Sequence, residues 1–120
     1  MFEFEKLDTY RLAIEFCQDV DGLLKKTSRS EYALSDQLRR AALSIPLNIA
    51  EGAGRWHDKE KRQYCFISRG SAFECVPILT LLENKQLISK EEHANSREKL
   101  KRIVQMLTKL AQSLDRDRDT

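Results

Sequence analysis

The two histidines are the first residues to consider for chemistry, because imidazole is the commonest metal ligand in proteins. Neither His57 nor His93 has a second ligand three or four residues away, as H-E-x-x-H or E-x-x-H sites require. Glu51 and Glu74 could join a carboxylate site inside a helical bundle, but a di-metal site needs two Glu-x-x-His pairs, which the chain lacks. The sequence therefore predicts no metal site and no cofactor, and we expect both histidines to be solvated.

Nucleophilic side chains are present, but their surroundings do not favour catalysis. Cys65 and Cys75 fall in apolar surroundings, where burial raises a thiol pKa and makes the thiol inert. Ser68 and Ser71 lack the strand-turn-helix context of a nucleophile elbow. The segment 52–54, Gly-Ala-Gly, lacks the third glycine and the Lys-Ser/Thr pair of a phosphate loop. We therefore predict no catalytic residue and a protein that is not an enzyme.

A short cluster of basic residues, interleaved with Trp56 and Tyr64, has the composition of a nucleic-acid contact. Asp58 and Glu60 dilute its charge, and a solvated helix start has much the same composition, so both interpretations stay open. The candidate phosphate contacts are Arg55, Lys59, Lys61 and Arg62.

Four stretches of the chain have the apolar spacing of amphipathic helices. We expect these helices at residues 8–26, 34–54, 58–84 and 89–114, with residues 115–120 as a frayed tail. Prolines 46 and 77 fall inside two of them, and we expect a kink at each. Short polar turns join the helices, so residues 1–120 form one domain. The predicted fold is all-α, an antiparallel up-down-up-down four-helix bundle.

The helix expected at 34–54 has two apolar faces rather than one. Leu38 and Ile45 belong to the first face, while Leu43 and Leu47 lie on a second face roughly 140° away at 100° per residue. One apolar face can pack inside the protomer, but the second needs another partner. We therefore expect a homo-oligomer with Leu43 and Leu47 at its interface.

A polar stripe separates these two faces, and residues of the next helix extend it. We expect a structural network that sets helix register or lies at a subunit interface; a ligand or nucleic-acid contact is the alternative. Buried charges must be paired, so its arginines would need its glutamates as partners. Its members are Arg40, Ser44, Asn48, Glu51, Arg69 and Glu74.

Composition narrows the function classes further. The 120 residues include 21 Lys+Arg and 19 Asp+Glu, a net charge of +2 that argues against a strongly basic nucleic-acid clamp but allows a local patch. Only 4 Gly and 2 Pro leave too little turn chemistry for a β-sandwich. An odd number of cysteines, no secretion signal and no apolar run near 18 residues predict a cytoplasmic protein with reduced thiols and no membrane segment.

One long run is far more specific than these patterns. Residues 37–55, QLRRAALSIPLNIAEGAGR, closely resemble the signature of 23S rRNA-intervening-sequence proteins, and two shorter segments agree with it, residues 4–7 and 69–74. The resemblance implies a small bacterial protein whose four-helix bundle assembles as a ring-like homopentamer, without catalytic residues. It also implies a fold similar to the accessory protein of diversity-generating retroelements, which binds a reverse transcriptase and nucleic acid.

Two function hypotheses follow from the residues and the resemblance together. The leading one is a non-enzymatic, oligomeric RNA-associated binding or scaffold module. The alternative is a protein-interaction module that engages a cytoplasmic partner such as a reverse transcriptase, without direct nucleic-acid contact.

Overall fold

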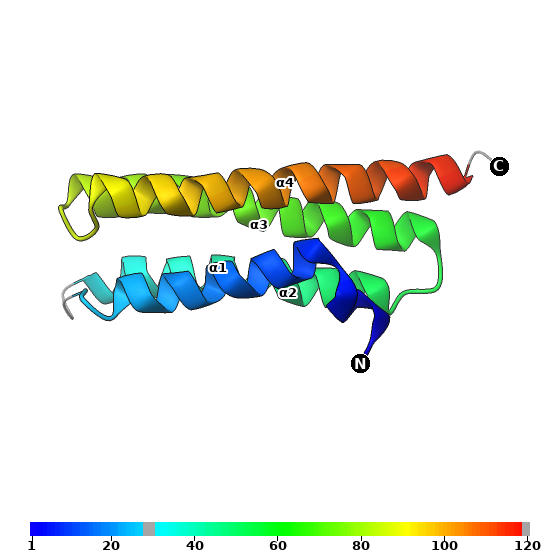
Figure 1. Ribbon diagram of the computed structural model, residues 1–120, viewed down its shortest axis with the longest axis horizontal. Helices are drawn as coiled ribbons and strands as arrows, with labels where there is room; N and C mark the ends of the chain where they lie inside the picture. The colour runs from blue at the N-terminus through cyan, green and yellow to red at the C-terminus, as the bar shows by residue number, and fades with distance from the viewer. Residues whose placement is uncertain (28–30, 119–120) are drawn as a thin grey trace.

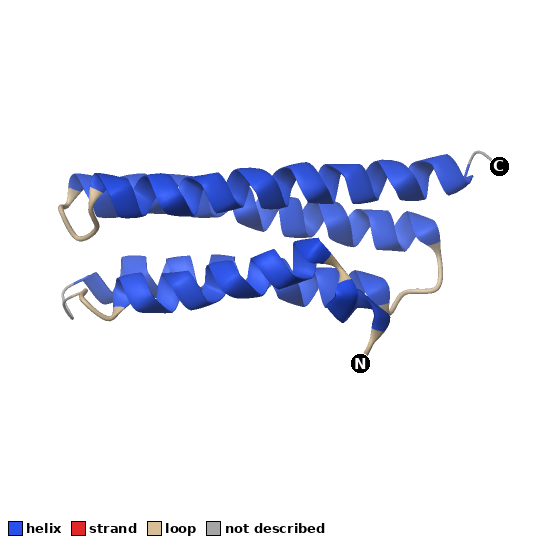
Figure 2. Cartoon of the chain, in the orientation of Figure 1, coloured by secondary structure: helices blue, strands red, loops and turns tan. Residues whose placement is uncertain are grey.

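The structure is a computed structural model that describes residues 1–27 and 31–118, with side chains through Asp115. This part of the chain contains no β-strand (Figure 2). It forms a short 3₁₀ helix, η1 (Glu3–Lys6), and four α-helices: α1 (Asp8–Leu24), α2 (Tyr32–Ala53), α3 (Asp58–Asn84) and α4 (Lys90–Arg118). Successive helices run in opposite directions along the long axis (Figure 1). The predicted all-α, up-down-up-down bundle is confirmed.

The predicted helix bounds are correct for α3 and need small changes elsewhere. Helix α1 ends at Leu24 instead of residue 26, and α2 runs from Tyr32 to Ala53. Helix α4 continues to Arg118, so the frayed tail predicted from residue 115 is wrong as far as the described backbone extends. An ion pair between Asp115 and Arg62 of α3 holds this last part of α4. Residues 28–30 and 119–120 lie outside the described residues.

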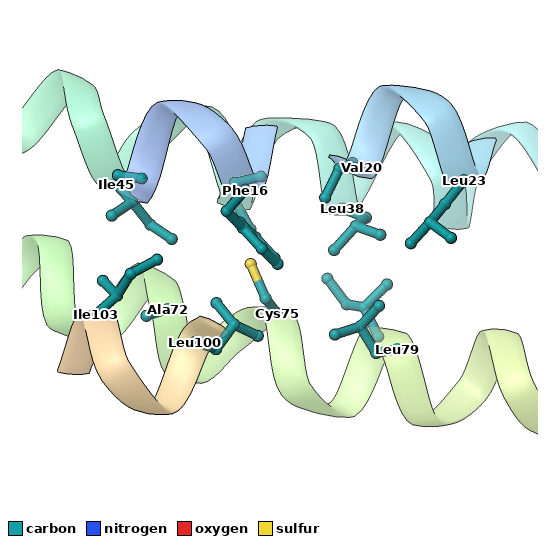
Figure 3. Packing of buried hydrophobic residues seen from close by; sticks show 14 of the residues in the cluster. Phe16, Val20, Leu23, Leu38, Ile45, Ala72, Cys75, Leu79, Leu100 and Ile103 are labelled. Carbon is teal, nitrogen blue, oxygen red and sulfur yellow. The ribbon is translucent and has the colours of Figure 1, made fainter. Parts of the chain in front are cut away.

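All four helices contribute to one continuous core (Figure 3). Phe16 of α1, Leu38 of α2, Leu79 of α3 and Ile103 of α4 are fully buried, and the Cys75 thiol packs among them. Within a helix the buried residues recur every three or four positions, as Leu38, Ala42, Ile45 and Ile49 do in α2. Pro46 and Pro77 do not end α2 or α3, because packing of the apolar stripes offsets the cost of a helical proline, about 3 kcal/mol.

Helix α3 contains a long apolar window. By length and composition it could cross a membrane, which the length of its apolar runs did not predict. The core helix of a bundle passes the same test, and seven α3 residues are buried against the other helices. Burial in the bundle accounts for part of this apolar character, since 44% of the apolar window is buried, and large apolar side chains on the other side of α3 stay exposed.

The two ends of the bundle differ in what they carry. The α1–α2 and α3–α4 connections lie at one end, while the α2–α3 turn and the C-terminus lie at the other (Figure 1). The α2–α3 turn contains residues 54–57, and Lys59 and Lys61 lie in the first turn of α3 that follows it. The predicted basic cluster therefore lies at one tip of the molecule.

Candidate nucleic-acid interface and assembly face

The α2–α3 turn is positioned by a close approach of the two helices at Gly52. A Cβ atom built on Gly52 would lie 2.7 Å from the Cβ of Tyr64, so only glycine fits without displacing α3. Tyr64 in turn holds Arg55: the Arg55 Nη2 donates to the Tyr64 hydroxyl and to Glu51 Oε1, both at 2.7 Å. The guanidinium also lies over the Tyr64 ring, 4.8 Å from its centroid. A small residue on α2 thereby fixes an arginine at the start of the turn.

The four predicted phosphate contacts have different surroundings. Arg55 is held by Glu51 and Tyr64, and Arg62 pairs with Asp115 at the end of α4. Lys59 is exposed and Lys61 is half-buried, and neither forms an ion pair with the described residues. The turn therefore offers two uncommitted cations per chain rather than four. Sequence reasoning missed this because Asp115 is 53 residues from Arg62.

Trp56 lies at the tip of the turn, with its side chain almost entirely in solvent. Its residue exposure is 93%, and the neighbouring His57 is also exposed. A shallow cavity of about 440 Å³ lies beside it, lined mainly by polar and charged residues of the turn and the adjoining helix ends. Trp56 belongs to the basic cluster predicted from the sequence, and the structure leaves it without packing partners in the protomer.

The uncharged part of the predicted polar stripe forms a network between α2 and α3. Asn48 Nδ2 donates to the carbonyl and hydroxyl oxygens of Ser44, at 2.8 and 2.9 Å. The Ser44 and Ser71 hydroxyls are 2.8 Å apart, and Ser71 Oγ donates to the carbonyl of Ile67 at 3.2 Å. With that Ser71 proton committed, Ser44 donates to Ser71. This chain of bonds joins the two helices in one register.

The charged residues of the polar stripe interact with other partners than the sequence predicted. Arg40 pairs with Asp36 at 2.8 Å, one turn away on α2, and Glu51 pairs with Arg55, four residues further on in the α2–α3 turn. Glu74 accepts a hydrogen bond from Gln37 at 2.8 Å. The expected pairing of Arg40 and Arg69 with Glu51 or Glu74 does not form in the protomer. Arg40 instead meets a carboxylate one helical turn away, and Arg69 forms no ion pair among the described residues.

Arg69 has a different environment from the other arginines. Its guanidinium lies over the ring of Phe73, 4.9 Å from the centroid. Its buried Nε atom has no hydrogen-bond partner among the described residues. Arg69 therefore brings a cation and an unsatisfied donor to the α3 surface beside Phe73.

Large apolar side chains of α2 and α3 point away from the core and form what we call the outer face. Leu43 and Leu47 are 52% and 57% exposed, so the second apolar face predicted for α2 is uncovered in the protomer. Gly70, on the neighbouring helix, has no atom within 4 Å of a built Cβ. The outer face consists of Leu43, Leu47, Phe66, Ile67, Phe73 and Leu81.

A groove of about 480 Å³ between α3 and α4 continues the outer face. Phe73, Val76 and Val104 line it, and Arg97 and Lys101 of α4 are charged residues in its wall. The helix pattern of the sequence did not predict this groove. The available signal was the stretch of α3 from residue 72 to 82, which is apolar on nearly every side.

The histidines and cysteines differ in how deeply they are buried. His57 is exposed as expected, but His93 is buried, with Nδ1 2.6 Å from Glu83 Oε1, so its predicted solvation is wrong. Cys65 and Cys75 are buried as predicted, and burial raises the pKa of the Cys75 thiol to about 12. Among the residues that the structure describes, no three His, Cys, Asp or Glu side chains gather as a metal site requires.

Comparison with known proteins decides the family. The sequence profile of the 23S rRNA-intervening sequence proteins matches residues 5–109. The chain belongs to this family. The resemblance carried by residues 37–55 is thereby confirmed over most of the chain.

A solved structure supports the fold of this family member. It is the crystal structure of a protein of unknown function from the S23 ribosomal protein family of Bacteroides thetaiotaomicron. The two structures superpose with a TM-score of 0.80, covering 86% of this chain and 97% of the other, at 22% sequence identity. No curated protein sequence matches the chain.

Proposed function

We propose that this family member is a non-enzymatic bacterial protein of the cytoplasm that assembles with copies of itself and binds RNA through the α2–α3 turn. The description of its family refers to 23S rRNA, and the similar solved structure is named for a ribosomal protein family. These names supply the class of nucleic acid. The surface of this chain supplies the argument for assembly and for the place of contact.

The outer face is the observation that carries the proposal. Six large apolar side chains on α2 and α3 are between 43% and 57% exposed. Burying apolar surface is favourable by about 25 cal/mol per Å², and contiguous patches of this kind mark interaction sites. An isolated protomer would leave this free energy unused, so the outer face is proposed to be covered in the working protein.

A second copy of the chain is the occupant that the surface fits. Leu43 and Leu47 project from α2, whereas the α3–α4 groove is a concave apolar surface. The hollow beside Leu47 holds Arg40 and Glu51, and the groove holds Arg97 and Lys101 beside Glu98, so both surfaces offer charged residues around an apolar centre. Two different patches that bind each other make a head-to-tail contact between protomers. Repeating this contact closes a ring when the rotation from one protomer to the next divides a full turn evenly. The pentamer implied by the family resemblance is such a ring.

RNA contact is proposed at the α2–α3 turn because its lysines are free to meet phosphates. Lys59 and Lys61 have no ion-pair partner among the described residues. A ring repeats this pair once per protomer, so weak contacts at each turn combine through multivalency. The low net charge of one chain therefore does not prevent binding by the assembly.

Two measurements test the two parts of the proposal separately. Light scattering should give about 70 kDa for a pentamer of the 14.0 kDa chain, and a monomer mass contradicts assembly. Titration of a labelled RNA at several salt concentrations should show affinity that falls with added salt. The absence of salt-sensitive binding at micromolar protein contradicts RNA contact and leaves assembly to be judged by mass alone.

The α3–α4 groove favours a second candidate function, a protein-interaction module. In that case a partner helix, for example from a reverse transcriptase, would lie in the groove against Phe73 and Val76. A pull-down from nuclease-treated extract separates the candidates. A protein that remains bound after nuclease treatment supports the module, and a protein that is lost was bridged by nucleic acid.

A further inference from the structure

We infer that the RNA segments recognised by the α2–α3 turn are unpaired, and that one of their bases stacks on Trp56. This inference rests on the RNA binding proposed above and names the class of RNA that the turn takes. It follows from the exposure of one aromatic side chain, the rigidity of the turn that carries it, and the small number of free cations around it.

The surroundings of Trp56 differ from those of the other exposed hydrophobic residues. Trp56 is 93% exposed, and the cavity beside it is lined by Glu51, Arg55, His57 and Glu60. An aromatic anchor for a protein partner is normally surrounded by further apolar contacts that exclude water. A lone indole among charged side chains instead matches the stacking platforms of proteins that bind single-stranded nucleic acid.

The turn holds Trp56 in a defined position even though the indole makes no packing contacts. Backbone amides on both sides are bonded: Arg55 N donates to the Gly52 carbonyl at 3.1 Å, and Lys61 N donates to the His57 carbonyl at 3.0 Å. The side chain of Arg55, directly before Trp56, is fixed by Glu51 and Tyr64. These bonds order the backbone that carries Trp56, so a base that binds there has to immobilise only the indole side chain.

The charges of the turn favour a single strand over a duplex. Lys59 and Lys61 form no ion pair within the part of the chain that the structure describes, whereas Arg55 and Arg62 are paired with carboxylates. Two phosphate contacts per chain give a slope of log K against log salt near −1.4 for a single strand, a weak electrostatic contribution. A duplex presents its phosphates but hides its base faces, so it gains little here. An unpaired base can also stack on Trp56, and this stacking is why the turn should bind single-stranded RNA more tightly than duplex RNA.

The experiment uses Trp56 as its own reporter, because the chain contains one tryptophan. The full-length protein is titrated with a single-stranded RNA and with a duplex of equal length, and tryptophan emission is recorded beside the anisotropy of a labelled strand. We expect the single strand to quench the emission and to bind at least about tenfold more tightly than the duplex. Trp56→Ala should weaken single-strand binding about tenfold or more, and Trp56→Phe should restore part of it.

The controls separate failure of this inference from failure of the proposed function. Salt-sensitive binding of duplex and single strand with equal affinity, unchanged in Trp56→Ala, overturns base stacking and leaves RNA binding in place. No binding of either RNA overturns both. A change in tryptophan emission with protein concentration, without RNA, shows that another copy covers Trp56 and overturns the inference. Circular dichroism of Trp56→Ala should match that of the parent protein, because the side chain packs against nothing in the protomer.

Discussion

The outer face and the α2–α3 turn belong to the same two helices, yet their exposed side chains have opposite character. The outer face presents leucine, isoleucine and phenylalanine, with the Ser44–Ser71 hydrogen bond at the seam between the helices. The turn presents one tryptophan among charged residues, and close by are two lysines that no described carboxylate pairs with. The comparison shows that one helix pair can carry two surfaces of different chemistry, which we propose meet a second copy and an RNA.

The origin of the difference lies in where helical periodicity ends. Within α2, a spacing of three and four residues maintains the buried face with Ile45 and the exposed face with Leu47. At Gly54 the helix stops, and the residues that follow no longer alternate between core and surface. Trp56 therefore becomes exposed because of its place in a turn, whereas Leu47 is exposed because of its angle on a helix.

The largest effect is expected for Leu47→Asp, which places a charge on the outer face. A buried, unpaired carboxylate is costly, so association should weaken by about a hundredfold or more. Light scattering should then report the 14.0 kDa monomer at concentrations at which the parent protein is assembled. Since Leu47 is 57% exposed in the protomer, the free energy of unfolding of the monomer should change by only about 0.5 kcal/mol.

Trp56→Ala is the matched control for this substitution, because it removes an exposed apolar side chain from the turn instead. Its oligomer mass should equal that of the parent protein. If Leu47→Asp remains fully assembled, the outer face is not the interface. If Trp56→Ala also dissociates, the two surfaces do not have separate roles.

A smaller effect is expected for Gly52→Ala, which tests how the helix packing supports the turn. The added Cβ would meet the Cβ of Tyr64 at 2.7 Å, and overpacking of this kind destabilises by about 1–3 kcal/mol. The displacement of Tyr64 should also release Arg55 and weaken RNA binding. Denaturant unfolding measures the first effect and the RNA titration measures the second.

Gly22 of α1 provides the control for Gly52. A Cβ at Gly22 has no atom within 4 Å, and alanine is the better helix former, so Gly22→Ala should stabilise by about 0.5–1 kcal/mol. Equal effects of the two substitutions would show that the close approach at Gly52 does not position the turn.

The fold was predictable because it depends on the spacing of apolar residues along each helix, and this spacing can be read from a single sequence. The apolar spacing along each helix predicts the helices, and on α2 it also predicts the buried face with Leu38 and Ile45. The exposed position of Leu47 was predictable for the same reason. The family signature in residues 37–55 is also local, since it occupies one continuous run of the chain, and the sequence alone suffices to recognise it.

The charge pairing at the candidate site was not predictable, because it depends on which long side chains reach each other. Arg62 finds Asp115 across the bundle, and His93 is buried against Glu83 near the α3–α4 turn. Arg40 finds Asp36 on its own helix, a pairing that the i, i+4 rule could have suggested. Composition reports the number of charges, but only the packed helices determine which of them remain free.

The smallest expected effect concerns the lysines of the turn. Neutralising both in Lys59→Gln/Lys61→Gln removes about two phosphate contacts, so the slope of log K against log salt should move from about −1.4 toward zero. Affinity for single-stranded RNA should fall only a few-fold at moderate salt, because stacking on Trp56 is kept, and tryptophan quenching at saturation should be unchanged. Lys25→Gln removes a charge at the opposite end of the bundle and should leave the slope as it is in the parent protein. A slope that persists in the double variant would place the phosphate contacts elsewhere on the chain, and the turn would then contribute a base platform alone.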